Sequence, residues 1–104
     1  MTLAELKTRS ETAGFNYAYG SFLQPTTLPH LVAYERESNN FFADSVTYKK
    51  ITPIKMDFSY EKKDLSLEAL IENSILYDIP WQKSEEAYFE NEKFWQVSYY
   101  FEIM

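Results

Sequence analysis

The sequence predicts an α+β domain: an antiparallel-rich mixed sheet of about four to six strands with one main helix, about 65–76, packed on one face, and a short N-terminal helix. Three stretches carry this prediction. Residues 94–104 and 54–61 alternate apolar and polar side chains with a period of two, which indicates strands with one buried face. Residues 67–75 place apolar side chains at helical spacing, which suits a helix lying across a sheet.

The N-terminal helix is expected over about residues 3–12. Thr2 and Glu5 fit a capping box, in which each side chain accepts a hydrogen bond from a backbone N–H of the first turn. Gly14 stands where a residue of left-handed conformation ends a helix. Residues 15–19 alternate as a short strand, and a loop with two prolines follows.

A hairpin is expected next, with its first strand at residues 31–35. Residues 46–48 return as its antiparallel partner across an asparagine-containing polar connection. Phe41 and Phe42 lie near the hairpin tip, where they either fold back on the core or project as a contact. Pro53 predicts a bend or an edge position, because proline cannot donate a hydrogen bond to a sheet ladder.

The main helix is expected to begin after Asp64, whose side chain can cap it. Beyond the helix, residues 77–82 indicate an irregular or edge strand, and Lys83 to Glu86 form a polar interruption. Residues 87–89 predict a short strand, with a turn at 91–92 before the terminal strand.

The terminal strand has two unlike faces. We expect the odd-numbered face to hold the sheet to the main helix; it comprises Trp95, Val97, Tyr99, Phe101 and Ile103. The other face carries polar residues together with Phe94 and Tyr100. These two aromatic residues are candidate subunit contacts.

Length and composition limit the possible classes of protein. At 104 residues the chain is one domain, 1–104, and its 45% hydrophobic and 18% aromatic content is typical of a folded protein. The absence of cysteine excludes disulfides, thiolate metal sites and cysteine nucleophiles. A net charge of −6 disfavours specific binding of nucleic acid, because phosphate neutralisation needs clustered lysine and arginine. No apolar run is long enough for a membrane span, and the first residues read as a helix opening rather than an export signal, so a cytoplasmic protein is expected.

Few residues suggest chemistry. His30 is the single histidine, and general acid–base catalysis would need a partner that the sequence does not indicate, so a surface or hydrogen-bonded structural role is favoured. The acidic pairs at 85–86 and 90–92 are interpreted as solvated loops, since they do not fit a calcium-binding loop. The two glycines do not form a phosphate-binding loop. We therefore expect no catalytic, cofactor-binding or metal-binding residues, and no enzyme.

Aromatic residues outside the clear strands are candidates for a binding surface, because aromatic side chains concentrate at the centres of interfaces. Simple filling of the core is an equally open explanation for each of them. These candidates are Phe22, Phe41, Phe42 and Trp81.

Four segments of residues 30–104 form a pattern that resembles a known family. They read NNFFAD at 39–44, VxYKKI at 46–51, KKDLxLE at 62–68 and ExEKxWQVxYxFEI at 90–103. This pattern resembles the small tail terminator or tail-completion proteins, which join head and tail in long-tailed phages and prophages of Gram-positive bacteria.

The resemblance implies a structural virion protein with an α+β fold. Such proteins form a ring, a hexamer in the virion, that caps the tail tube, contacts the tail-tube protein and the head connector proteins, and lets DNA pass without specific recognition. The resemblance implies assembly in the host cytoplasm and a final place at the head–tail interface. The family has no catalytic residues to transfer to this chain. The alternative from composition is a small acidic protein-binding or regulatory module without catalytic activity.

Overall fold

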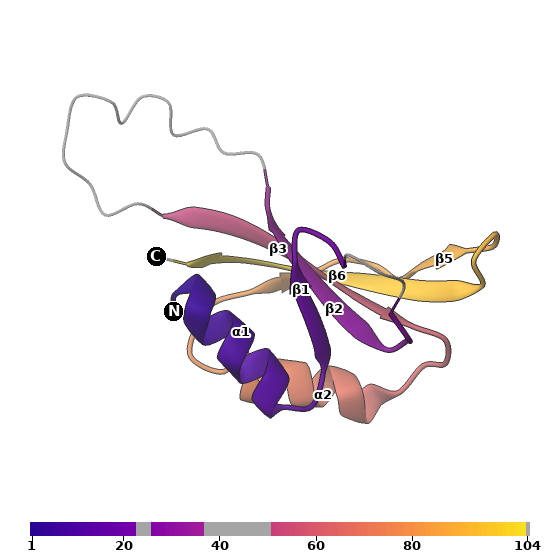
Figure 1. The fold of residues 1–104 in the computed structure, drawn as a ribbon, viewed down its shortest axis with the longest axis horizontal. Coiled ribbons are helices and arrows are strands. Elements are labelled where there is room, and N and C mark those ends of the chain that lie inside the picture. Colours follow the sequence, from indigo (N-terminus) through magenta and orange to yellow (C-terminus); the bar gives the residue numbers. More distant parts are fainter. Residues whose placement is uncertain (23–25, 37–50, 104) are drawn as a thin grey trace.

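The computed structural model describes residues 1–22, 26–36 and 51–103, which hold two helices and six strands (Figure 1). The elements are α1 (Leu3–Thr12), β1 (Asn16–Tyr19), β2 (His30–Glu35), β3 (Thr52–Tyr60), α2 (Leu65–Ser74), β4 (Gln82–Lys83), β5 (Ala87–Phe89) and β6 (Phe94–Ile103). The α+β prediction is confirmed. The expectations for Phe41, Phe42 and the strand at 46–48 lie outside the described residues.

The sheet is mixed but mostly antiparallel, in the order β1-β2-β3-β6-β4, with β5 also paired to β6. β1 runs parallel to β2, and the other pairs are antiparallel. The longest pairing joins β3 to β6, from Thr52 opposite Ile103 to Tyr60 opposite Trp95. These two strands form the centre of the sheet, so β1 and β5 lie on opposite sides of it.

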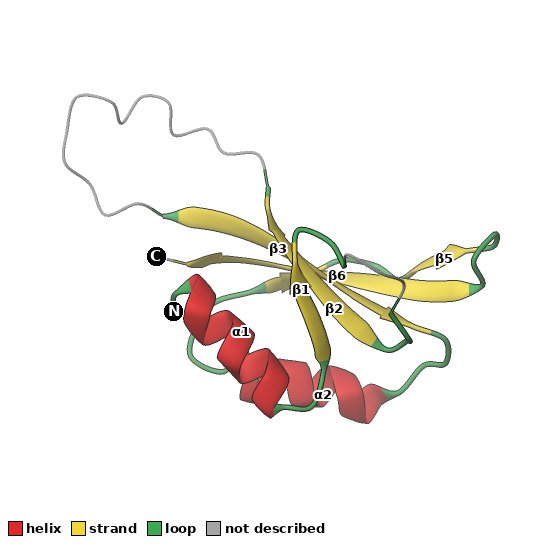
Figure 2. Cartoon of the chain, viewed as in Figure 1, coloured by secondary structure: helices red, strands yellow, loops and turns green. Residues whose placement is uncertain are grey.

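Both helices lie on the same side of the sheet (Figure 2). The core forms between the sheet and the two helices, because every second side chain of each strand points toward the helices. Its members are Leu6, Phe15, Leu31, Ala33, Ile54, Met56, Phe58, Tyr60, Ile71, Ile75, Leu76, Val97, Tyr99, Phe101 and Ile103. The predicted alternation of β3 and most of that of β6 is thereby confirmed. None of the helices in the described ranges is long and apolar enough to cross a membrane.

The assignment of Trp95 to the buried face was wrong in one respect, since its side chain is 38% exposed. Trp95 belongs to the last residue pair between β3 and β6. The β5–β6 hairpin extends past the end of α2 (Figure 1), so the helix layer does not reach this end of the strand. Period-two alternation identifies the face of a side chain but not how far the covering layer extends.

The capping box of α1 is confirmed. The Glu5 N–H donates to Thr2 Oγ1 at 3.2 Å, and the Thr2 N–H donates to Glu5 Oε1 at 3.3 Å. Gly14 follows the helix with a φ of 92°, in the left-handed region. Arg9 then fixes α1 to the segment after α2 by two hydrogen bonds to the Asp78 carboxylate, at 2.8 and 3.0 Å.

Of the two alternatives for Pro53, the bend is absent and the edge position is observed: Pro53 lies within β3 opposite Glu102, beyond the last residue pair with β2. Its carbonyl accepts a hydrogen bond of 3.0 Å from the Arg36 N–H. The reciprocal bond of this pair would need a proline N–H, and pairing between β2 and β3 ends with Glu35 opposite Ile54. Proline is therefore accommodated where its missing donor coincides with the end of the ladder.

In the second half of the chain the expected helix and strands are present, and only their boundaries differ. Asp64 caps α2 as predicted, accepting from the Ser66 N–H at 3.0 Å. The strand expected over 77–82 is shorter and shifted, since β4 comprises only Gln82 and Lys83. Residues 87–89 form the predicted short strand.

Candidate functional site

The strands β5 and β6 form a hairpin whose outer end carries four aromatic side chains, Tyr88, Phe89, Phe94 and Trp95. We call it the aromatic hairpin. Tyr88 lies opposite Trp95 with ring centroids 4.9 Å apart, and Phe89 lies opposite Phe94 with centroids 4.8 Å apart. Tyr88 is 46% exposed, Phe89 39% and Trp95 38%. Such a concentration of partly exposed aromatic rings marks a surface suited to contact another protein.

The two aromatic pairs lie on opposite faces of the hairpin, because neighbouring residues of a strand alternate. Trp95 shares its face with the buried Val97 and Tyr99, on the helix side of the sheet. Phe89 and Phe94 lie on the other face. The hairpin is therefore apolar on both sides, as expected of an element that inserts between other surfaces rather than covering its own core.

A four-residue turn, 90–93, closes the hairpin. Lys93 adopts a φ of 57°, and its N–H donates to the Phe89 carbonyl at 2.7 Å. The carboxylates of Glu90 and Glu92 are in exposed residues of this turn. The tip thus combines aromatic rings with acidic side chains.

An ionic cluster holds the base of the hairpin. Glu68 of α2 is 3% exposed, and its carboxylate lies 2.6 Å from Lys63 Nζ and 2.7 Å from Lys83 Nζ. Lys83 also pairs with Glu72 at 2.9 Å, and Lys63 with Glu86 at 3.1 Å. Charges alternate along the series Glu86, Lys63, Glu68, Lys83 and Glu72, so each ammonium group lies between two carboxylates.

Two tyrosine hydroxyls extend this cluster into the sheet. Tyr99 Oη donates to Glu72 Oε2 at 2.9 Å, and Tyr60 Oη donates to the Glu86 carboxylate. Burial and the hydrogen bond to Glu72 both raise the pKa of Tyr99. Glu86 lies in an exposed loop, as predicted, and its carboxylate also pairs with Tyr60 and Lys63.

The pKa of Glu68 reports the balance of forces in the cluster. Burial alone would raise this pKa, but the ion pairs with the Lys63 and Lys83 ammonium groups together outweigh burial and hold it below its ordinary value. The ionised carboxylate is therefore the stable form in the folded chain. The cluster therefore joins α2 to β4 and to Glu86, the residue before β5.

A second aromatic group lies on the sheet face away from the helices. Lys55 Nζ lies 5.7 Å from the centre of the Tyr34 ring and 6.0 Å from that of Tyr100. The Arg36 guanidinium lies 5.5 Å from the Tyr100 ring centre. Tyr100 is half-buried, on the outward face as the alternation predicts. Cation–π contacts thus orient this residue without covering it with a second layer.

The other predicted contact residues are dispersed. Phe22 packs against the His30 ring, with centroids 5.1 Å apart, and Trp81 packs edge-on against the buried Tyr99 at 5.6 Å. Of the six candidates, Phe94 belongs to the aromatic hairpin, and Phe41 and Phe42 lie outside the described residues. The sequence interpretation missed Tyr88, Phe89 and Trp95. Their signal was symmetry about the turn, with two aromatic residues directly before it and two directly after it.

His30 is half-buried, and burial lowers its pKa. Within the described ranges its Nδ1 atom is buried without a hydrogen-bond partner. The described residues also contain no group of three or more histidine, aspartate and glutamate side chains placed to hold a metal ion.

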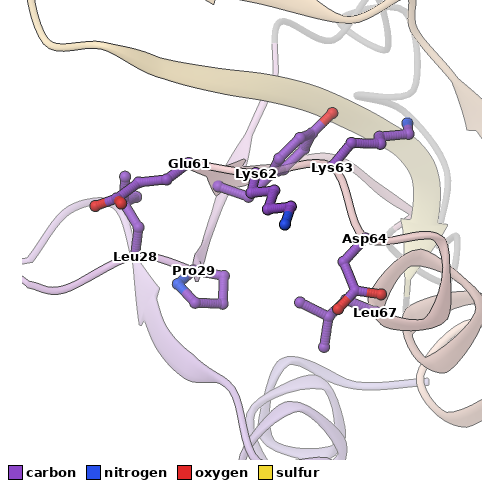
Figure 3. A pocket seen from close by; sticks show the side chains of 8 residues that line it. Leu28, Pro29, Glu61, Lys62, Lys63, Asp64 and Leu67 are labelled. Atoms are coloured by element: carbon purple, nitrogen blue, oxygen red, sulfur yellow. The ribbon is translucent and has the colours of Figure 1, made fainter.

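A hollow of about 380 Å³ opens beside the start of α2, between Leu28, Pro29, the residues 60–64 and Leu67 (Figure 3). Its two lysines and the helix N-terminus would attract an anion. The Asp64 carboxylate already occupies the Ser66 N–H, and Lys63 is already paired with Glu68 and Glu86. The chain's own carboxylates therefore already engage Lys63 and the Ser66 N–H, two of the groups that a bound anion would use.

A larger hollow, of about 510 Å³, lies between α1 and β1. It is at the β1 edge of the sheet, opposite the edge that carries the hairpin. We call it the α1–β1 groove. Its lining residues are Leu3, Ala4, Lys7, Tyr17, Ala18 and Tyr19. Leu3 is 42% exposed and Tyr19 46%, so the groove is a second partly exposed apolar surface.

Comparisons of the chain with protein-family models, with curated proteins and with solved structures give no match.

Proposed function

We propose that this chain is a structural, non-catalytic subunit of a phage tail: a tail terminator or tail-completion protein that assembles as a ring, caps the tail tube and joins it to the head connector. The observation that carries the proposal is the aromatic hairpin. It leaves Tyr88, Phe89 and Trp95 partly exposed at a projecting end of the sheet. Side chains of this kind supply most of the binding free energy in protein interfaces.

The hairpin and the resemblance to phage proteins coincide in the sequence. Residues 90–103, which carry the longest segment of that resemblance, form the turn of the hairpin and the whole of β6. The ionic cluster supports the same interpretation, since it fixes the base of the hairpin to α2. A preordered hairpin loses less conformational entropy on binding than a flexible one.

The test combines purified chain with polymerising tail-tube protein and follows tube length by electron microscopy. The proposal expects capped tubes of limited length, with a ring of this chain at one end. A double variant, Phe89→Ser with Trp95→Ser, should abolish capping. The matched control, Tyr77→Ser, removes an exposed aromatic side chain elsewhere and should cap normally. Tubes that grow equally with and without the wild-type chain would contradict the proposal.

A second candidate function is an acidic protein-binding or regulatory module. The net charge of −6 and the two carboxylates at the hairpin tip favour it. In that case the aromatic hairpin would contact a basic surface of a host protein. Capture of a specific host protein by wild-type chain, lost when Glu90 and Glu92 are changed to lysine and unaffected by tail-tube protein, would favour this function over the first.

A further inference from the structure

We infer that the aromatic hairpin of one copy docks in the α1–β1 groove of a second copy of this chain, forming a head-to-tail contact. This inference rests on the proposed function only in taking the chain to be a subunit of an assembly. It names the two surfaces that meet, and neither is the outward face of Tyr100.

The first argument is the placement of the two surfaces. The groove is built on β1, and the hairpin on β5 and β6, which lie at opposite sides of the sheet. The hairpin also projects away from the body of the molecule (Figure 1), so it cannot reach the groove of its own copy. Contact between the two surfaces therefore requires a neighbour, and an open row of copies has one unused hairpin and one unused groove at its ends.

The second argument is the chemistry of the two surfaces. The groove is lined by aliphatic side chains of α1 and by tyrosine rings of β1, and its volume is about 510 Å³. The hairpin presents rings on both faces, so it can contact the helix wall and the strand wall together. Burying these rings removes apolar surface from water on both copies, which is the main favourable term in association.

The third argument is charge. Lys7 lines the groove, and the hairpin turn carries Glu90 and Glu92. A docked hairpin would bring opposite charges together at the rim, which fixes orientation and speeds encounter. Two hairpins meeting tip to tip would instead bring four carboxylates together, so charge favours the groove over a symmetric hairpin–hairpin contact.

A contact between unlike surfaces has a structural consequence. Each copy can donate its hairpin to one neighbour and receive a hairpin from another, so the contact propagates. It produces a ring when the rotation between copies closes, and an open filament when it does not.

The chain offers a clean cross-linking test, because it contains no cysteine. Lys7→Cys and Glu92→Cys chains, mixed at high concentration under mild oxidation, should form a disulfide-linked heterodimer. The double variant, Lys7→Cys with Glu92→Cys, should form a ladder of covalent oligomers. A mixture of Asn73→Cys with Glu92→Cys is the matched control, since Asn73 is exposed on α2, and it should give no specific heterodimer. Cross-linking no greater than in this control would overturn the inference.

A complementation experiment separates a head-to-tail contact from a symmetric one. Trp95→Ser impairs the hairpin, and Ala4→Arg blocks the groove, and each should weaken self-association by about 30-fold or more in sedimentation velocity. Mixed together, the two variants should form a dimer, because one intact hairpin and one intact groove remain. Failure of the mixture to associate more strongly than each variant alone would overturn the inference. Both variants must retain the wild-type far-UV circular dichroism spectrum. A second pair serves the same purpose: the double variant Glu90→Lys, Glu92→Lys changes the hairpin, and Lys7→Glu changes the groove.

These outcomes are distinct from those of the proposed function. Head-to-tail cross-links in a chain that fails to cap tail tubes would retain this contact and reject the phage-tail role. Capped tubes without the Lys7–Glu92 cross-link would retain the role and reject this contact.

Discussion

Lys83 and Glu68 form an ion pair across 2.7 Å, although one residue belongs to the two-residue strand β4 and the other to α2. The Glu68 side chain is buried, whereas that of Lys83 remains partly exposed. β4 is too short to be held firmly by backbone hydrogen bonds alone. The ion pair joins this strand to α2, and the N–H of Ser84, the next residue, donates to the Ser98 carbonyl of β6 at 2.9 Å.

Glu68→Gln should lower the free energy of unfolding by about 1.5–3 kcal/mol, the range for hydrogen bonds to charged groups. The change removes the negative charge between Lys63 and Lys83 but keeps the size of the side chain. Urea denaturation followed by circular dichroism measures the loss. Glu61→Gln is the matched control, because Glu61 is exposed, and it should change stability by less than about 0.5 kcal/mol. An equal effect of the two substitutions would contradict the role assigned to the cluster.

Stability should fall in acid, below about pH 4.5. The hydrogen bond from Tyr60 and the neighbouring Lys63 lower the pKa of Glu86. Ion pairs with Lys63 and Lys83 lower the pKa of Glu68, and Arg9 lowers that of Asp78. A carboxyl group whose folded pKa is depressed contributes stability above its unfolded pKa, ordinarily 4.5 for glutamate, and loses it as the pH falls through the folded value. Urea midpoints measured from pH 7 to pH 3 should decline, and the decline should be shallower in Glu68→Gln. A parallel decline in both proteins would show that Glu68 does not contribute.

Most of the fold was predictable because its elements have strong periodicity. The alternation of β3 and the capping residues Thr2 and Asp64 reflect local rules that the rest of the fold does not override. Glu68 was missed for a definite reason. It precedes Ile71 and Ile75 by three and seven residues, so it lies on the buried side of α2, but a charged residue at such a position is ordinarily assigned to solvent. Its burial is possible only because Lys63 and Lys83, from other parts of the chain, pair with its carboxylate.

The hairpin was harder to predict, because its exposure depends on relative lengths. Trp95 has the same alternation as Val97 and Tyr99, and the sequence does not contain the distance at which α2 ceases to cover the sheet. Pairing of β5 with β6 then places Tyr88 beside Trp95. A contact surface forms where β5 and β6 extend beyond the helices that cover the rest of the sheet.

Tyr100→Lys should leave the monomer folded and reduce assembly if the outward face of β6 also contacts a neighbour. Tyr100 is half-buried and carries no core packing on the helix side, but the new ammonium would lie near Arg36 and Lys55, costing about 1 kcal/mol together with the lost cation–π contacts. Thermal unfolding measures the first effect, and sedimentation velocity the second. Tyr100→Phe keeps the ring and is the control. An unfolded Tyr100→Lys monomer would mean that this face is part of the core.

Lys83→Met should loosen the aromatic hairpin without touching it. The substitution removes the ion pairs to Glu68 and Glu72 but keeps an apolar stem of similar length beside Tyr99. Amide hydrogen exchange in residues 87–89 should become faster, because opening of β5 then requires less free energy, whereas exchange in the β3–β6 centre should be unchanged. Self-association should weaken in the same variant, since a mobile hairpin loses more entropy on docking. Lys62→Met, an exposed neighbour in the loop before α2, is the control. Unchanged exchange in residues 87–89 would mean that pairing with β6 alone orders the hairpin, and that the cluster stabilises α2 without preparing the contact surface.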